Sequence, residues 1–323
     1  MLKIKKLIKS YKSFPVLLEL NMNVQKGDVY GFLGTNGCGK TTTMNIICNI
    51  IPKDSGEVVF EDENVKIGYL PESPALYNYM NGFEYLNFIG ACSEYEGDIK
   101  ERTAEVLKIT GMAESAHRLI GGYSRGMNQR IGIAAALYPK PDLLILDEPT
   151  SALDPAGRAE VMEIIEKLSK SGATIILCTH ILGDVERVAN KIGIMHKGVL
   201  AVEGDLSAVK NYYSAGGSLT VRLQNSLIDD SLRNVALTAL SELDIVETCE
   251  TMHYGDFHVY SKRDVKEAEL FYKVATTLAG NQIVPEGIWF NRISLEQIYL
   301  GINSGQLQPM GSILTAPGRV AAF

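Results

Sequence analysis

A chain of 323 residues, 46% of them hydrophobic, is long enough for one large domain with a substantial core and a smaller second domain. A formal net charge of −7 and a pI near 5.4 argue against a general nucleic-acid-binding protein, which usually carries a basic surface. The cysteines are scattered and odd in number, without a Cys-x-x-Cys pair, which excludes a disulfide framework and indicates reduced thiols.

The first residues show no signal peptide, and the longest apolar runs, such as residues 131–138, are too short to cross a bilayer. We therefore expect a cytoplasmic protein. If it serves a membrane process, another chain must supply the membrane-spanning part.

A glycine-rich loop is the strongest feature of the N-terminal part. Residues 1–33 predict strands, and the apolar run 29–33 is typical of a buried strand that enters the loop Gly34-Thr35-Asn36-Gly37-Cys38-Gly39-Lys40-Thr41-Thr42. This loop fits the pattern G-x-x-x-x-G-K-[ST], and residues 42–50 predict a helix after it. Its backbone N–H groups and the helix N-terminus favour phosphate binding. We expect Lys40 to reach the β- and γ-phosphates of a nucleotide and the Thr41 hydroxyl to bind Mg²⁺.

Two interpretations of Cys38 are open. The N-terminus of the following helix and the charge of Lys40 would favour a thiolate, whose reactivity bound nucleotide would control. Alternatively, Cys38 is a small residue that fills the turn.

From residue 57 to residue 195, strand patterns alternate with helical patterns. A helical stretch at about 74–140 ends at Pro139 and Pro141, and strands are predicted at residues 57–60, 67–70, 142–148, 174–178 and 192–195. Helices are predicted at residues 158–170 and 182–189. This alternation predicts an α/β fold with a mostly parallel sheet that helices cover on both faces.

Asp147 and Glu148 end the apolar run 143–146, which is typical of a central parallel strand whose carboxyl end faces a site. Beside a phosphate loop, the first acid can hold Mg²⁺. The second can orient or deprotonate the attacking water, because phosphoryl transfer depends on positioning and charge stabilisation.

Several motifs occur in a fixed order along residues 1–212. The phosphate loop is followed by residues 123–130 (Tyr-Ser-Arg-Gly-Met-Asn-Gln-Arg), by the acidic strand end with residues 149–154, and by His180. Together they resemble an ATP-binding cassette (ABC) ATPase, a P-loop NTPase whose signature is LSGGQ followed by QR. Arg125 and Met127 depart from that signature, and Glu72 stands where the family usually has a Mg²⁺-linked Gln. These variants resemble the branch that serves exporters with separate membrane subunits.

The resemblance implies a head-to-tail dimer, homodimeric or heterodimeric with a similar subunit, that encloses two ATP molecules. It implies that the loop residues from Gly34 to Thr42 bind ATP and that Tyr11 stacks on adenine. Ser124 and Gly126 would contact the γ-phosphate in the partner's site, and His180 would sense it. Thr41, Glu72 and Asp147 would bind Mg²⁺. Lys40, Glu148 and His180 would be the catalytic residues.

Beyond residue 212 the pattern βαββαβ predicts a small α+β domain of the ferredoxin-like kind over residues 213–302. Ser294 is the predicted cap of its last helix. The segment 303–323 is rich in Gly, Pro and small residues, and we expect it to be poorly ordered.

The sequence therefore predicts an ATP-hydrolysing subunit on the cytoplasmic face of the membrane, which powers a separately encoded permease. The resemblance implies that this transporter is an exporter. Two alternatives stay open. One is an ABC ATPase that acts on ribosomes or DNA. The other is a regulatory subunit that binds nucleotide without turnover, against which the intact Lys40, Asp147, Glu148 and His180 argue.

Overall fold

The computed structural model describes residues 1–93, 95–214, 217–223, 230–252, 256–262, 265–291, 293–309 and 311–312. The chain forms two compact units. Unit 1 comprises Met1–Leu206 together with the described residues from Tyr299 onward, and unit 2 comprises Ser207–Ile298. The boundaries at 212 and 302 stay predictions, and each unit is described by itself below.

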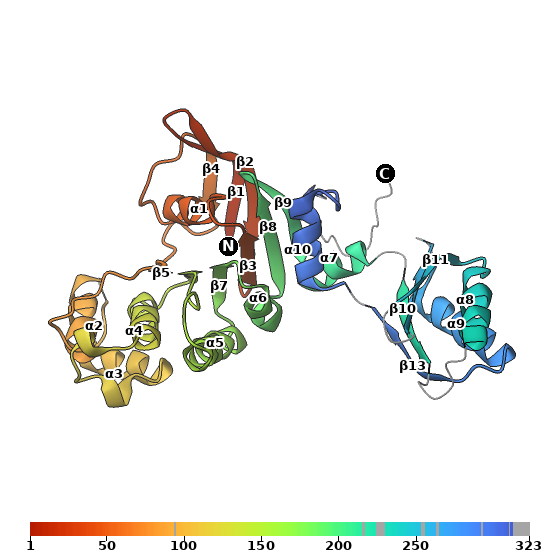
Figure 1. Ribbon diagram of the computed structural model, residues 1–323. Coiled ribbons are helices and arrows are strands. Elements are labelled where there is room, and N and C mark those ends of the chain that lie inside the picture. Colours follow the sequence, from red (N-terminus) through yellow and green to blue (C-terminus); the bar gives the residue numbers. More distant parts are fainter. Residues whose placement is uncertain are drawn as a thin grey trace. The chain divides into compact units, whose positions relative to one another are not determined.

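Unit 1 is built on a seven-stranded sheet in the order β14-β9-β8-β3-β7-β6-β5 (Figure 1). Its inner strands are β8 (Lys191–His196), β3 (Val29–Gly34), β7 (Thr174–Thr179), β6 (Leu143–Asp147) and β5 (Ile67–Leu70). Neighbours pair in parallel along the whole sheet except at β8 and β9 (Val199–Asp205), which are antiparallel. The prediction of a mostly parallel sheet is confirmed.

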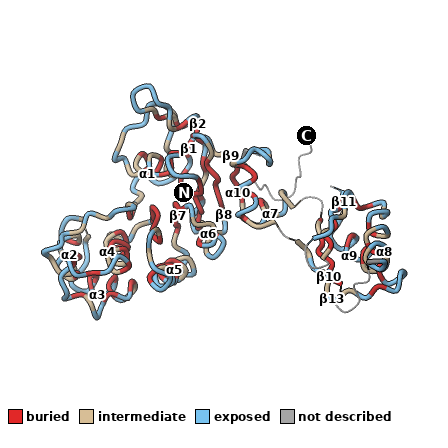
Figure 2. The backbone as a smooth tube through the Cα atoms, viewed as in Figure 1, coloured by how far each residue is buried: buried red, intermediate tan, exposed pale blue. Residues whose placement is uncertain are grey.

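The central strands are apolar runs because both of their faces are covered. Every residue of β3, β6 and β7 is buried (Figure 2). The main helices outside the subdomain described below are α1 (Lys40–Ile47), α5 (Pro155–Lys170) and α6 (Leu182–Val188). None of the helices that the structure describes has the length and hydropathy of a membrane span. Since β3, β6 and β7 run parallel, the loops that follow them emerge at one edge of the sheet.

A second, antiparallel sheet of three strands has the order β2-β1-β4. These strands are β1 (Leu2–Tyr11), β2 (Phe14–Val24) and β4 (Ser55–Phe60). Alternate residues of β1, such as Leu2 and Ile4, join Phe32 of β3 and Met44 of α1 in one buried core. The core therefore fixes the phosphate-loop strand and helix against this sheet.

The predicted helical stretch contains α2 (Gly82–Cys92), α3 (Ile99–Ile109) and α4 (Arg125–Leu137), which gather in one part of unit 1 (Figure 1). Two short 3₁₀ turns, η1 (Ala113–Ser115) and η2 (Ile120–Gly122), connect α3 to α4. Polar caps begin all three helices: Asn81 for α2, Asp98 for α3 and Ser124 for α4.

Strand β9 was not predicted. It follows β8 through a tight turn in which Lys197 and Gly198 both have positive φ, at 48° and 82°. Such a turn usually carries Asn-Gly or Asp-Gly, so the Lys197-Gly198 pair does not predict a β-hairpin.

That residues 303–323 are poorly ordered stays a prediction, and the structure describes residues 303–309 and 311–312 of this segment. Helix α10 (Leu295–Ser304) includes Asn303, whose side-chain oxygen lies 2.8 Å from Nδ1 of His196. Strand β14 (Gly311–Ser312) pairs with β9, whose edge offers unpaired backbone groups. The composition of residues 303–312 does not predict either the Asn303–His196 contact or the pairing of β14 with β9. Residues 313–323 lie outside the described residues.

Unit 2 has strands β10 (Ser218–Leu223), β11 (Val246–Thr251), β12 (Asp256–Ser261) and β13 (Pro285–Phe290), with helices α8 (Asp230–Ser241) and α9 (Glu267–Gly280). Helix α7 (Leu206–Tyr213) leads into it. The four-stranded antiparallel order β11-β12-β10-β13 is the topology of a ferredoxin-like split unit. Ser294 caps α10, since its hydroxyl accepts a hydrogen bond from the Gln297 N–H.

Candidate nucleotide-binding site

The glycine-rich loop connects β3 to α1 and depends on two glycines with positive φ. Gly37 has φ 79° and Gly39 has φ 111°, values that side-chain-bearing residues rarely adopt. A Cβ on Gly39 would also lie 2.8 Å from side-chain atoms of Leu17 and Met195. Gly39 is the N-cap of α1 and has no side chain to cap the helix. The first N–H groups of α1 are therefore available to an anion.

A cavity of about 460 Å³ lies at this loop. Its lining includes most of the predicted site residues: Asn36, Gly37, Gly39, Lys40, Thr41, Thr42, Glu72, Glu148 and His180, together with Val16 and Ser151. Residues from five separate segments line this cavity. Four of these segments follow strands β3, β5, β6 and β7, as expected for the carboxyl ends of a parallel sheet, and Val16 comes from β2.

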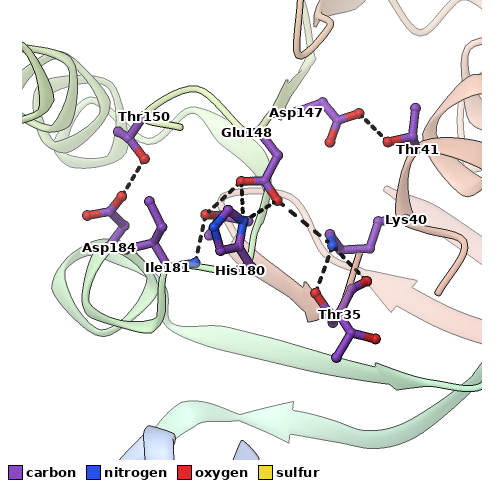
Figure 3. A network of polar contacts seen from close by, with 11 residues as sticks. Thr35, Lys40, Thr41, Asp147, Glu148, Thr150, His180, Ile181 and Asp184 are labelled. Atoms are coloured by element: carbon purple, nitrogen blue, oxygen red, sulfur yellow. Dashed lines mark hydrogen bonds and ion pairs between the residues drawn. The ribbon is translucent and has the colours of Figure 1, made fainter. Parts of the chain in front are cut away.

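Lys40 is buried at the base of this cavity (Figure 3). Its Nζ donates to the carbonyl oxygen of Gly34 at 2.7 Å and to that of Thr35 at 3.3 Å. It also lies 3.8 Å from Oε1 of Glu148. A buried cation beside a free helix N-terminus makes the loop electropositive, which suits a polyphosphate.

Thr41 and Asp147 are in direct contact (Figure 3). The Thr41 hydroxyl donates to Oδ2 of Asp147 at 2.8 Å, while Oδ1 of Asp147 is buried and has no hydrogen-bond partner among the described residues. Burial raises the pKa of the Asp147 carboxyl, and the nearby charges of Glu148 and Glu72 add to this, although Thr41 and Lys40 act in the opposite direction. A carboxylate oxygen without a partner beside a hydroxyl fits a hard divalent cation such as Mg²⁺.

Glu148 lies at the centre of the polar network (Figure 3). Its Oε2 is 2.9 Å from Nδ1 of His180 and accepts a hydrogen bond from the Thr179 hydroxyl at 3.4 Å. Glu148 itself has φ 49°, and its N–H donates to the carbonyl oxygen of Cys178. Thr179 was not predicted. Its position at the end of a buried strand next to His180 was the only available signal.

Tyr11, Ser124 and Gly126 do not line this cavity. Tyr11 is half exposed at the turn between β1 and β2, where Lys9 Nζ lies 5.6 Å from its ring centre. The Ser124 hydroxyl accepts from the Met127 N–H at the start of α4. A Cβ on Gly126 would lie 3.5 Å from Cα of Gly157, so α4 and α5 approach closely at this glycine.

Cys38 is buried, and burial raises the pKa of its thiol more strongly than Lys40 lowers it. A Cβ placed on Gly34 would meet the Cys38 sulfur at 2.4 Å. Both observations favour the interpretation that Cys38 fills the turn, because a protonated, enclosed thiol reacts slowly.

Comparison with known proteins agrees with this geometry. The family model described as ABC transporter matches residues 17–151. The lantibiotic transport ATP-binding protein SrtF of Streptococcus pyogenes is 37% identical over 65% of this chain and 93% of its own. The bacitracin transport ATP-binding protein BcrA of Enterococcus faecalis is 37% identical over 62% of this chain and 68% of its own. The chain belongs to the ABC transporter ATP-binding family.

A solved structure shares this fold. The ATP-binding cassette MJ0796, described as dimeric and bound to ADP and Pi after hydrolysis, is 26% identical to this chain with a TM-score of 0.58. The match covers 64% of this chain and 99% of that one. The P-loop NTPase fold predicted for the N-terminal part is confirmed, and the family assignment supports ATP binding and hydrolysis.

Proposed function

We propose that this protein is the ATP-hydrolysing subunit of a membrane transporter, that it dimerises on ATP and that the transporter exports its substrate. The observation that carries the proposal is the convergence of Lys40, Glu148 and His180 on the phosphate-loop cavity. Lys40 would hold the phosphates, and Glu148 would orient and deprotonate the attacking water. His180, in contact with Glu148, would stabilise charge that develops on the γ-phosphate.

Mg²⁺ would be held by Thr41 and Asp147, with Glu72 as a further residue that lines the cavity. When bound, the ion neutralises charge on the phosphates. Glu72 lines the cavity and follows strand β5, and its backbone carbonyl oxygen accepts from Gln129 Nε2 at 3.3 Å. The Glu72 carboxylate itself is free to face the phosphates, which supports a role as a metal ligand or as the partner of a metal-bound water.

Replacement Glu72→Gln should shift the Mg²⁺ concentration that gives half-maximal hydrolysis and leave thermal stability nearly unchanged. The amide keeps the shape of the side chain and removes the charge. Steady-state hydrolysis at a series of Mg²⁺ concentrations, with a thermal melt of the same sample, checks this. An unaltered Mg²⁺ curve would make Glu72 a bystander.

The dimer is supported by residues that lie away from the cavity. Ser124 and Gly126 begin helix α4, and the Ser124 hydroxyl caps it. In the arrangement we propose, this helix N-terminus contributes to the second copy's site and meets the γ-phosphate there. The second copy can be identical or a similar subunit. Tyr11 would cover adenine at the open side of the same site.

A permease encoded separately is the proposed partner, at the cytoplasmic face of the membrane. SrtF and BcrA are named for lantibiotic and bacitracin transport, which supports a role in a transporter. Unit 1 also exposes an aromatic patch, formed by Tyr77, Tyr79 and Phe88. Tyr77 packs against Tyr79 and Phe88 with ring centres 5.7 Å apart in both pairs. Exposed clusters of this kind usually mark a protein contact.

The protein should sediment with membranes only when its permease is present, and Tyr79→Asp should abolish that association without changing hydrolysis by the free subunit. Tyr79 is 73% exposed, so the substitution leaves the fold intact. The matched control is Tyr272→Asp in unit 2, which is 69% exposed. Tight binding of the purified wild-type protein to protein-free liposomes would contradict the prediction.

Two other functions are less well supported. An ABC ATPase that acts on ribosomes or DNA is expected to carry a basic surface, whereas the net charge of this chain is −7. A regulatory subunit without turnover would not need the Glu148–His180 contact of 2.9 Å beside Lys40. Measuring phosphate release by the purified protein with MgATP separates the last possibility from an ATPase.

A further inference from the structure

Three polar side chains outside the cavity form a cluster that we call the clasp: Thr150, Arg158 and Asp184. Thr150 and Asp184 are buried, and Arg158 is partly exposed. The Thr150 hydroxyl donates to Oδ2 of Asp184 at 2.5 Å. Arg158 donates from Nε and from Nη2 to Oδ1 of Asp184, at 2.9 and 2.7 Å. Thr150 is 2% exposed and Asp184 3% exposed. Both carboxylate oxygens are therefore satisfied, and the buried charge of Asp184 is paired.

The clasp joins three segments that each lead to the site. Thr150 lies two residues after Glu148, in the loop between β6 and α5. Asp184 lies in α6, four residues after His180, and Arg158 lies in the first turns of α5. Figure 3 shows Thr150 and Asp184 beside the Glu148–His180 contact. The clasp thus ties the loop that carries Glu148 to the helix that follows His180.

The loop that the clasp holds is strained. Glu148 and Ala152 both have positive φ, at 49° and 54°, although neither is glycine. A turn between them is closed by the N–H of Ser151, which donates to the Glu148 carbonyl oxygen at 3.1 Å. Strained residues persist only where surrounding contacts hold them. Thr150 lies between the two strained residues and is anchored through its side chain to another element.

We propose that Asp184 and Thr150 are positioning residues for hydrolysis, which hold the strained loop so that the Glu148 carboxylate stays against His180. The inference rests on the proposed ATPase function and deepens it. Neither Thr150 nor Asp184 lines the phosphate-loop cavity. They act through Glu148, so they should affect the chemical step and leave nucleotide binding alone.

Thr150→Val keeps the shape of the side chain and removes the hydroxyl. We expect kcat to fall about 10-fold, since small misplacements of a catalytic group cost up to about 10²-fold. KM and the affinity for a fluorescent ATP analogue should stay within about twofold. Asp184→Asn should behave similarly, because it removes the negative charge that pairs with Arg158 and leaves one acceptor oxygen where the carboxylate has two. Thr150→Ser restores the hydroxyl and should recover most of the rate.

A matched control is present between the same two helices. Arg187 of α6 contacts Glu166 of α5 through an ion pair on the surface, away from the loop. Glu166→Gln breaks that pair and should leave kcat at the wild-type value. Thermal melts of all variants show whether any loss of rate follows from loss of stability.

A double-mutant cycle with Glu148 distinguishes a positioning role from a purely structural one. The measured quantity is the residual rate of hydrolysis on the Glu148→Gln background. If Thr150 acts through Glu148, then adding Thr150→Val to Glu148→Gln should change the residual rate by less than about twofold, because effects through one group are not additive. Wild-type kcat in Thr150→Val and Asp184→Asn, or a full 10-fold loss on the Glu148→Gln background, would overturn the inference while the ATPase function stands. A wild-type protein without turnover would overturn both.

Discussion

Replacing Glu148 by Gln should lower ATP hydrolysis by about 10²–10⁴-fold, the usual share of a positioned general base. The amide cannot accept the proton of the attacking water, yet it can keep the contacts with Thr179 and His180. Lys40 keeps its hydrogen bonds to Gly34 and Thr35, so ATP should still bind. Phosphate release under steady-state conditions and equilibrium binding of a labelled ATP measure the two effects separately.

The same variant should accumulate an ATP-bound dimer that size-exclusion chromatography resolves from the monomer, because hydrolysis no longer separates the subunits. Glu163→Gln is a suitable control. Glu163 lies on α5 and pairs with Lys167 at the surface, so it should leave turnover unchanged. Near-normal hydrolysis in Glu148→Gln would remove this carboxylate from the mechanism.

Asp147→Asn should reduce hydrolysis by about 10²–10³-fold and at the same time stabilise the protein without nucleotide. The loss would follow from a weaker Mg²⁺ ligand in the site that we propose, since a bound metal contributes several kcal/mol of charge stabilisation in the transition state. The gain follows from burial, which raises the pKa of the Asp147 carboxyl and makes its ionised form costly. Relief of this cost should raise the free energy of unfolding.

The pH dependence of that gain has a definite sign. A carboxyl whose pKa is raised in the folded state binds its proton more tightly there than in the unfolded chain. The ionised form therefore destabilises the wild-type protein above the folded pKa, and the penalty disappears as the pH falls toward about 4, the unfolded value. The melting temperature of Asp147→Asn minus that of wild type, without Mg²⁺ or nucleotide, should be largest at neutral pH. A difference that grows with acid would contradict this origin.

The sequence predicted most strands and helices of unit 1 because apolar periodicity and the motifs agree there. It missed β9, since the Lys197-Gly198 turn lacks the usual residues. It also placed the end of the phosphate-loop helix at residue 50, whereas α1 ends at Ile47 and Asn49 adopts φ 55°. Backbone conformation of this kind depends on the neighbouring core and cannot be recognised from periodicity alone.

The site residues that could be predicted from the sequence are those that directly follow a predicted strand. Lys40, Glu148 and His180 follow β3, β6 and β7, which are neighbours in the sheet. The clasp was not predictable, because Thr150 and Asp184 are 34 residues apart and each is typical of a loop or of a solvated helix face. Only the packing of α5 and α6 brings these side chains together and excludes water from them.

The order of the two units along the chain determines which contacts a C-terminal truncation would remove. Unit 1 contains Met1–Leu206 and also Tyr299 and the described residues after it, so residues 207–298 are an insertion within unit 1. The Asn303–His196 contact and the strand beside β9 both come after this insertion in the sequence. A premature stop codon after residue 206 would therefore remove them and leave the edge of β9 uncovered, a common start of aggregation.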